Sequence, residues 1–253
     1  MKLHRFFVEE KIPNVGGINL GRATKFADSE TGRPSGEFSV ANETLLNQWR
    51  NVLRMEAGSN VILFDGGGSE SLCEFVSLDK KRATLKILEQ KAGLVPLRAV
   101  TLYMALIKKD NFELVLEKAT ELGVSHIVPV EVARSEKKGV NYERSQKIVR
   151  EASEQSGRAT VPTIGEICSI DKGPGRPGLP GVVVFDPRGG ISAREFFAVN
   201  NTSPVFVFIG PEGGFTDEEM ELFHARNIPV VSTGTQILRA ETAAIVALTL
   251  ALV

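Results

Sequence analysis

The chain of 253 residues has little cysteine and almost no net charge. Its two cysteines, Cys73 and Cys168, lie far apart and lack the neighbouring cysteine or histidine spacing of a zinc site. We therefore expect two free thiols in a reducing compartment and no metal. Lysine and arginine together number 30 against 31 acidic residues, which excludes a globally basic protein. A nucleic-acid partner would have to bind a local basic patch.

Long hydrophobic runs and targeting segments are also missing. The longest apolar run, residues 243–253, is shorter than the ~20 residues that a membrane-spanning helix needs. The N-terminal segment becomes polar at Glu9 and Glu10, unlike a secretory signal. We therefore expect a soluble, cytoplasmic protein with no membrane partner.

Common catalytic motifs are absent as well. The sequence contains no GxxxxGK[ST] phosphate loop, no HExxH zinc motif and no GxSxG nucleophile motif. The three histidines, His4, His126 and His224, have no serine or cysteine partner nearby, so we interpret them as packed or surface residues. These absences argue against a hydrolase and against an enzyme that uses nucleoside triphosphates.

The first ninety or so residues have the pattern of a β-rich domain. Short apolar segments, one of them alternating with period two, predict strands over residues 6–8, 37–40, 60–64, 73–76 and 83–87. The glycines of the segment 65–69 indicate a hairpin turn, because glycine readily adopts positive φ. One short helix is expected over residues 42–55. This pattern favours a small β-barrel in residues 1–92.

After Pro96 the pattern changes to strands that alternate with helices, which predicts a parallel α/β sheet in residues 93–253. The expected strands are 100–106, 127–130, 182–185, 205–209 and 228–231, and the expected helices are 111–122, 141–156, 216–226 and 238–253. Asn111, Asn141 and Thr216 are the predicted N-caps, the last forming a capping box with Glu219, and Gly123 is the predicted end of the first helix. The closing helix is apolar nearly all round, so the core, a partner subunit or both must bury it.

Two segments follow strands of this sheet, at the carboxyl ends where open α/β sheets bind ligands. In the first, Phe208–Thr216, three glycines allow a ligand to approach the backbone closely. The second, Ser232–Ala244, places Arg239 and Glu241 at the start of an apolar helix. Taken singly, the first is also consistent with a tight connection and the second with a solvated first helical turn. The two together are far more specific.

The sequence pair GPEGGF and GTQILRAETAA closely resembles the C-terminal motifs of the SPOUT methyltransferases. The segments EKATELGV (117–124), EASEQSGR (151–158), RFFV (5–8) and VLRMEAG (52–58) narrow the resemblance to the ribosomal small subunit methyltransferase E family. This resemblance covers nearly the whole chain. It implies an α/β trefoil-knot methyltransferase domain in residues 93–253 and a smaller, RNA-binding PUA-like β-barrel in residues 1–92. Thr233 and Gln236 stand where the family more often has leucine and arginine.

The resemblance also implies the reaction: S-adenosylmethionine as methyl donor, and N3 of one uridine in the 16S rRNA of the small ribosomal subunit as acceptor. A homodimer is expected. The implied cofactor-binding residues are Val184, Phe185, Ile209, Gly210, Pro211, Glu212, Gly213, Gly214, Thr233, Gly234, Ile237, Leu238, Ala240 and Thr242. As catalytic residues we expect Arg239, which would stabilise negative charge on the uracil, and Glu241, which would orient Arg239 or accept a proton. The alternative is an Arg–Glu ion pair that only fixes the helix.

A local basic patch supplies the RNA-binding prediction. Between Arg134 and Arg150 the sequence carries six positive and two negative side chains, which favours a phosphate-binding face. With the neighbouring positions and the barrel, the predicted RNA-binding residues are Arg5, Arg54, Lys108, Lys109, Arg134, Lys137, Lys138 and Arg158. Two alternative functions remain at this stage: another SPOUT methyltransferase that acts on tRNA, and a non-catalytic assembly factor that binds rRNA.

Overall fold

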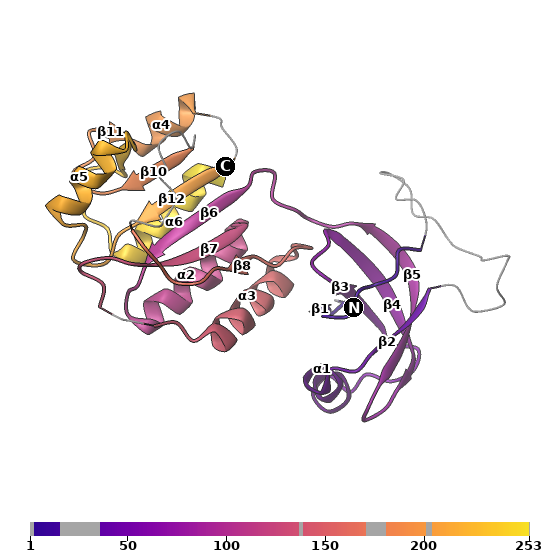
Figure 1. Cartoon of the computed structure of the whole chain (residues 1–253). Helices are drawn as coiled ribbons and strands as arrows, with labels where there is room; N and C mark the ends of the chain where they lie inside the picture. The colour runs from indigo at the N-terminus through magenta and orange to yellow at the C-terminus, as the bar shows by residue number, and fades with distance from the viewer. Residues whose placement is uncertain (1–2, 16–35, 137–138, 171–180, 201–203, 253) are drawn as a thin grey trace. The chain divides into compact units, whose positions relative to one another are not determined.

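The computed structural model describes residues 3–15, 36–136, 139–170, 181–200 and 204–252 (Figure 1). The chain divides into two compact units. The first comprises Met1–Val95 with Ser153–Thr160, and the second comprises Pro96–Ala152 with Val161–Val253. The domain ranges 1–92 and 93–253 stay predictions. None of the helices among the described residues is both long and apolar enough to cross a membrane.

The first unit contains a mixed five-stranded sheet in the order β1-β3-β4-β5-β2. Its strands are β1 (Arg5–Phe7), β2 (Glu37–Val40), β3 (Asn60–Phe64), β4 (Ser69–Leu78) and β5 (Ala83–Ala92). β1 runs parallel to β3, and the other pairs are antiparallel. Gly66 and Gly68 have φ of 83° and 88° between β3 and β4, which confirms the predicted hairpin turn. The β-rich character of this half is therefore confirmed.

The predicted helix over residues 42–55 is shorter and less regular than expected. It divides into α1 (Glu43–Asn47) and a π-helix, η1 (Gln48–Val52). Asn42 caps α1 by accepting a hydrogen bond from the Leu45 amide at 3.1 Å. The wider π-turn accompanies burial of Trp49, which packs edge-to-face on Phe75 in the core of the sheet, with ring centroids 5.1 Å apart.

The second unit is built on an eight-stranded sheet whose described pairings are all parallel, which confirms the predicted α/β class. The strand order is β11-β13-β10-β12-β6-β7-β8, with β9 also paired to β7. The strands are β6 (Val100–Ala105), β7 (His126–Glu131), β8 (Thr163–Ile164), β9 (Cys168–Ser169), β10 (Val182–Phe185), β11 (Ile191–Ser192), β12 (Val205–Ile209) and β13 (Val230–Ser232). β13 pairs with β10, so the chain crosses over from β12 to the far side of β10. The trefoil knot stays a prediction.

Helices cover both faces of this sheet. They are α2 (Lys109–Leu122), α3 (Tyr142–Ser156), α4 (Ala193–Val199), α5 (Asp217–Ala225) and α6 (Ala240–Leu252). One core cluster joins alternate strand residues such as Leu102 and Met104 to α2, α3, α4 and α6. A second cluster joins the opposite face to α5. Because side chains alternate along a strand, β6, β7, β10, β12 and β13 each supply residues to both cores.

Most of the predicted helix ends are confirmed. Thr216 and Glu219 form the capping box of α5, and Gly123, with φ of 108°, ends α2. Asn141 accepts a hydrogen bond from the Arg144 amide at 3.0 Å at the start of α3. The prediction for Asn111 was wrong: α2 begins at Lys109, because the Lys108 carbonyl already accepts a hydrogen bond from the Phe112 amide.

Candidate active site

The carboxyl ends of β10, β12 and β13 bring the two segments singled out in the sequence to one edge of the sheet. Phe185 pairs in register with Ile209 on one side and with Val231 on the other, so the following loops start at the same level. A cavity of about 40 Å³ lies between the loops after β10 and β13. Its lining residues are Phe185, Asp186, Pro187, Thr233, Gln236, Leu238 and Ala243.

The glycine loop, residues 210–214, is tightly constrained by its surroundings. A Cβ atom on Gly210 would lie 3.0 Å from the ring of Phe215, and Gly214 has φ of 68°. Phe215 is buried and packs edge-to-face on Phe223 of α5. Larger residues at these two glycines would therefore clash or strain the backbone, whereas Glu212 and Gly213 are exposed to solvent.

Two arginines donate hydrogen bonds to carbonyl groups in this loop and in Phe215, which follows it. Arg134, from the segment after β7, donates from Nη1 to the Gly213 carbonyl at 2.7 Å and to the Phe215 carbonyl at 3.4 Å. Arg188, from the loop after β10, donates from Nη2 to the same Phe215 carbonyl at 2.9 Å. The sequence prediction placed Arg134 among the RNA-binding residues and missed Arg188.

Arg188 also ties together the loop after β10 and the start of α5. It makes a bidentate interaction with the buried Asp186, with Nε–Oδ1 at 2.8 Å and Nη2–Oδ2 at 3.0 Å, and reaches Asp217 at 3.0 Å. Hydrogen bonding to Asp186 is the main reason that the pKa of Arg188 is raised. The sequence signal for this network was present as Asp-Pro-Arg directly after a buried strand.

The segment after β13 exposes most of its side chains. Residues 233–237 are exposed, and Ile237 is 84% exposed although it is a large apolar residue. Arg239 is exposed, whereas Glu241 is 8% exposed and its Oε2 has no hydrogen-bond partner. Arg239 and Glu241 form no ion pair among the described residues. The structure therefore does not show the alternative in which an Arg–Glu ion pair only fixes the helix.

The predicted cofactor-binding residues fall into three groups. Phe185, Thr233 and Leu238 line the cavity. The glycine loop, Gly234, Ile237 and Thr242 lie on the neighbouring loops or at the start of α6. Val184, Ile209 and Ala240 are buried in the cores. Because the side chains of this last group are buried, only their backbone atoms can contact a ligand.

The predicted RNA-binding residues differ in their surroundings. In the first unit, Arg5 forms an ion pair with Glu70, donates to the Arg158 carbonyl at 3.0 Å and lies over the Phe64 ring. Arg158 is 6% exposed, and burial lowers the pKa of its guanidinium. These interactions hold the first unit together and leave little of either side chain for RNA. Arg54 is exposed.

In the second unit the basic side chains have acidic neighbours. Lys108 lies 3.9 Å from Glu136, and Lys109 lies 3.7 Å from Glu113. Lys137 and Lys138 fall outside the described residues. The described part of the chain contains no group of three or more His, Cys, Asp or Glu side chains that could hold a metal ion.

Comparison with known families assigns both halves of the chain. Residues 95–252 match the RNA methyltransferase domain, and residues 50–88 match the RNA methyltransferase PUA domain. The chain is 32% identical to ribosomal RNA small subunit methyltransferase E of Rickettsia conorii, over 85% of this chain and 88% of that protein. It is 31% identical to the protein of the same name from Bacillus subtilis, over 83% of this chain and 88% of that protein.

Solved structures show the same architecture. A methyltransferase structure from Legionella pneumophila, in complex with the cofactor SAM, superposes with a TM-score of 0.80 at 25% identity, over 98% of this chain and 96% of the other. The ribosomal RNA small subunit methyltransferase E of Neisseria gonorrhoeae, bound to S-adenosyl methionine, gives a TM-score of 0.78 at 26% identity, over 98% and 95% of the two chains. From these matches over both halves, the chain belongs to the ribosomal RNA small subunit methyltransferase E family.

Proposed function

We propose that this protein transfers a methyl group from S-adenosylmethionine to N3 of a specific uridine in the 16S rRNA of the small ribosomal subunit. The observation that carries the proposal is the meeting of the glycine loop and the segment 232–239 at one sheet edge, beside a cavity. Relatives of this family have been solved with this cofactor bound to the same fold.

The residues at this edge fit such a cofactor. Gly210, Gly213 and Gly234 expose backbone groups that can bond to an adenine edge, and Leu238 and the exposed Ile237 can cover its faces. The enclosed volume suits one fragment of the ligand, so the open loops must supply the remaining contacts. When bound, S-adenosylmethionine supplies an electrophilic methyl group on its sulfonium centre.

The chain's own residues then provide orientation and charge. Uridine N3 must lose a proton as it becomes a nucleophile, and negative charge spreads to O2 and O4. The exposed Arg239 guanidinium, which has no ion-pair partner among the described residues, is available to stabilise that charge. Oε2 of Glu241, buried without a partner, is available to accept a proton or to orient a donor.

A homodimer completes the proposal. Ile245 and Val246 lie half-exposed on α6 and outside the core clusters, although most of that helix is buried. A second copy of the chain that covers these two apolar side chains would remove them from water.

The substrate is tested by transfer of labelled methyl groups from S-adenosylmethionine. Small ribosomal subunits that lack their uridine methylation, free rRNA and bulk tRNA are compared in parallel. Label in the subunit or in free rRNA supports the proposal. Label in tRNA alone identifies a different methyltransferase, and cofactor binding without any transfer favours a non-catalytic assembly factor.

A further inference from the structure

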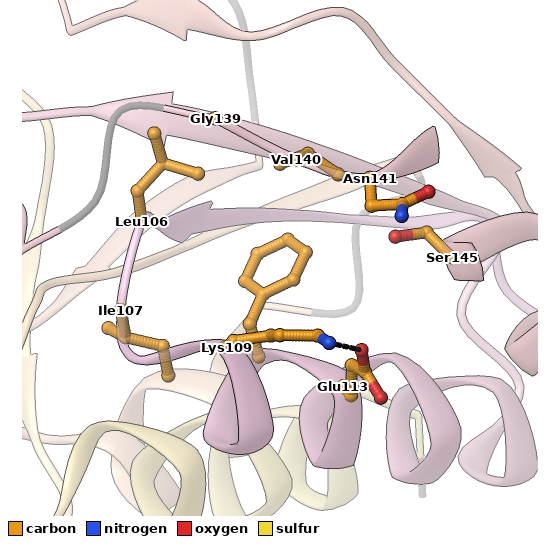
Figure 2. A pocket seen from close by; sticks show the side chains of 9 residues that line it. Leu106, Ile107, Lys109, Glu113, Gly139, Val140, Asn141 and Ser145 are labelled. Atoms are coloured by element: carbon orange, nitrogen blue, oxygen red, sulfur yellow. Dashed lines mark ion pairs between the residues drawn. The ribbon is translucent and has the colours of Figure 1, made fainter. Parts of the chain in front are cut away.

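A second cavity, of about 300 Å³, lies in the second unit at the carboxyl end of β6 (Figure 2). This volume is at the lower end of the ~300–1,000 Å³ that is typical of small-molecule sites. The lining residues are Leu106, Ile107, Lys109, Phe112, Glu113, Gly139, Val140, Asn141 and Ser145. They come from the segment after β6, from the start of α2 and from the entry to α3. None of them belongs to the loops described above for the cofactor.

One part of the lining is apolar. Leu106 and Ile107 leave the end of β6, and Val140 lies across the cavity from them (Figure 2). Phe112 of α2 adds an aromatic ring to the lining. Apolar and aromatic side chains around a cavity of this size suit a flat ring, because they can cover its faces.

The remaining lining is polar and has unused hydrogen-bonding capacity. Ser145 is 4% exposed and lines the cavity (Figure 2). The side-chain oxygen Oδ1 of Asn141 accepts a hydrogen bond from the backbone amide of Arg144. The side-chain NH₂ group of Asn141 can therefore donate to a ligand. A hydroxyl and an amide NH₂ group that line a cavity can both donate hydrogen bonds to the acceptor atoms of a ligand.

The charges at the rim favour a neutral ligand. The Lys109 ammonium lies 3.7 Å from the Glu113 carboxylate, which also accepts a hydrogen bond from Arg144 at 3.2 Å. Lys109 and Arg144 are both paired with this carboxylate, so among the described residues they do not offer a phosphate group an unpaired cation. A nucleobase fits better, since it is uncharged, has two apolar faces and carries its polar groups on the edge. Uracil presents O2 and O4, which match the donors of Ser145, Asn141 and Lys109.

The cavity and the glycine loop follow neighbouring strands of the sheet. Met104 of β6 pairs in register with Ile209 of β12, so Leu106 and Gly210 follow neighbouring strand ends at nearly the same level. Residues that follow β7 contribute to both the glycine loop and the cavity. Arg134 donates a hydrogen bond to the Gly213 carbonyl, and Gly139 lines the cavity.

We propose that this cavity receives an unpaired uracil of the RNA substrate after the base has left its stack. The proposal rests on the proposed function and adds the place where the base is held. Ser145, Asn141 and Lys109 bind O2 and O4, which leaves N3 unblocked. Cytosine binds less well, because its amino group places a donor where uracil has the O4 acceptor.

The test uses the full chain with ¹³C-labelled Leu, Ile and Val methyl groups, titrated with uridine and with cytidine and followed by NMR. We expect uridine to shift the methyl signals of Leu106, Ile107 and Val140 and cytidine to shift them less. Ser145→Val removes the hydroxyl and fills part of the cavity, so it should weaken uridine binding about tenfold. The matched control is Gln146→Ala, an exposed neighbour on the same helix that does not line the cavity.

The outcomes separate this proposal from the proposed function. Uridine that leaves these methyl signals unmoved, or that binds Ser145→Val as well as the wild type, overturns the uracil site. Binding of S-adenosylmethionine by Ser145→Val should stay within about twofold of wild type, because Ser145 lies outside the cofactor loops. Normal uridine shifts in a protein that methylates no RNA would overturn the proposed function and leave the uracil site standing.

Discussion

Arg239 and Glu241 lie two positions apart but in opposite environments. The arginine is exposed and the glutamate is 8% exposed, with one carboxylate oxygen lacking a partner. An exposed arginine contributes little to stability, whereas a buried carboxylate without a partner costs stability. The arginine is thus the better residue for separating catalysis from folding.

We predict that Arg239→Ala lowers the rate constant for methyl transfer about 10²-fold to 10³-fold, as expected for loss of one electrostatic stabiliser. Thermal stability should change by less than about 0.5 kcal/mol, because the side chain is exposed. Single-turnover methyl transfer and thermal unfolding measure the two effects, with cofactor affinity determined by calorimetry. An unchanged rate, or a fall that simply follows lost stability, would contradict the catalytic role.

Cys73 gives a prediction for pH. Burial raises the pKa of this thiol from 9.0 to about 12. Below pH 9 the thiol is neutral in both the folded and the unfolded chain, so its contribution to stability is fully present. As the pH rises above 9, only the unfolded chain ionises, and the folded state loses about 1.4 kcal/mol per pH unit relative to it.

Cys73→Ala removes this ionisation, and the small cavity that it leaves lowers stability equally at every pH. The difference in unfolding free energy between wild type and variant should therefore be constant below pH 9 and shift in favour of the variant above it. Denaturant unfolding at a series of pH values measures the difference. A difference that stays flat up to pH 11 would show that the thiol ionises equally in both states.

Arg188 joins three parts of the candidate site. It connects Asp186 after β10, the Phe215 carbonyl in the segment that follows the glycine loop, and Asp217 at the start of α5. Gly189 permits the close approach of this loop to β13, since a Cβ there would lie 2.4 Å from the Val231 carbonyl carbon. We therefore expect Arg188 to position the cofactor loops rather than to touch the reacting atoms.

Arg188→Lys should raise the KM for S-adenosylmethionine about tenfold and change kcat little, because lysine keeps the charge but cannot form the bidentate contact. Arg194→Lys, on an exposed position of α4, is the matched control. Steady-state kinetics and calorimetric titration check the split between KM and kcat. Equal losses in the two variants, or a loss confined to kcat, would contradict a positioning role.

Local signals in the sequence predicted the elements that local interactions determine. The capping box of Thr216 and Glu219, the C-terminal Gly123 and the hairpin glycines act within a few residues and are confirmed. The two-residue strands β8, β9 and β11 were not predicted, because their pairing depends on distant partners. The same holds for the candidate site. The sequence singled out both loops, but the hydrogen bonds from Arg134 to Gly213 and from Arg188 to Phe215 join residues far apart in sequence.

A further non-local feature is the membership of Ser153–Thr160 in the first unit. The Gly68 amide donates to the Ala159 carbonyl, and the Ala159 amide donates to the Leu94 carbonyl. A Cβ on Gly93 would lie 2.3 Å from the Cβ of Ala159, so only glycine fits there. The helical periodicity of residues 141–156 does not indicate that the chain after this helix pairs with Gly68 and Leu94.

The outward face of α6 leads to a prediction about association of two copies of the chain. Ile245→Glu with Val246→Glu should convert the proposed dimer to a monomer, because charges cannot be buried in an apolar contact without a partner. Light scattering after size exclusion measures the mass, and thermal unfolding checks that the chain still folds. A wild-type protein that is monomeric at micromolar concentration would contradict the proposed dimer.

The identity of the modified nucleoside distinguishes methylation at uridine N3 from methylation at any other position. Small subunits lacking the modification are incubated with the protein and labelled S-adenosylmethionine, and their RNA is digested to nucleosides and separated beside standards. We predict a single labelled product that coelutes with 3-methyluridine and forms much more slowly with Arg239→Ala. Label in a 2′-O-methylated nucleoside, in 5-methyluridine or in a methylated guanosine would contradict the assignment.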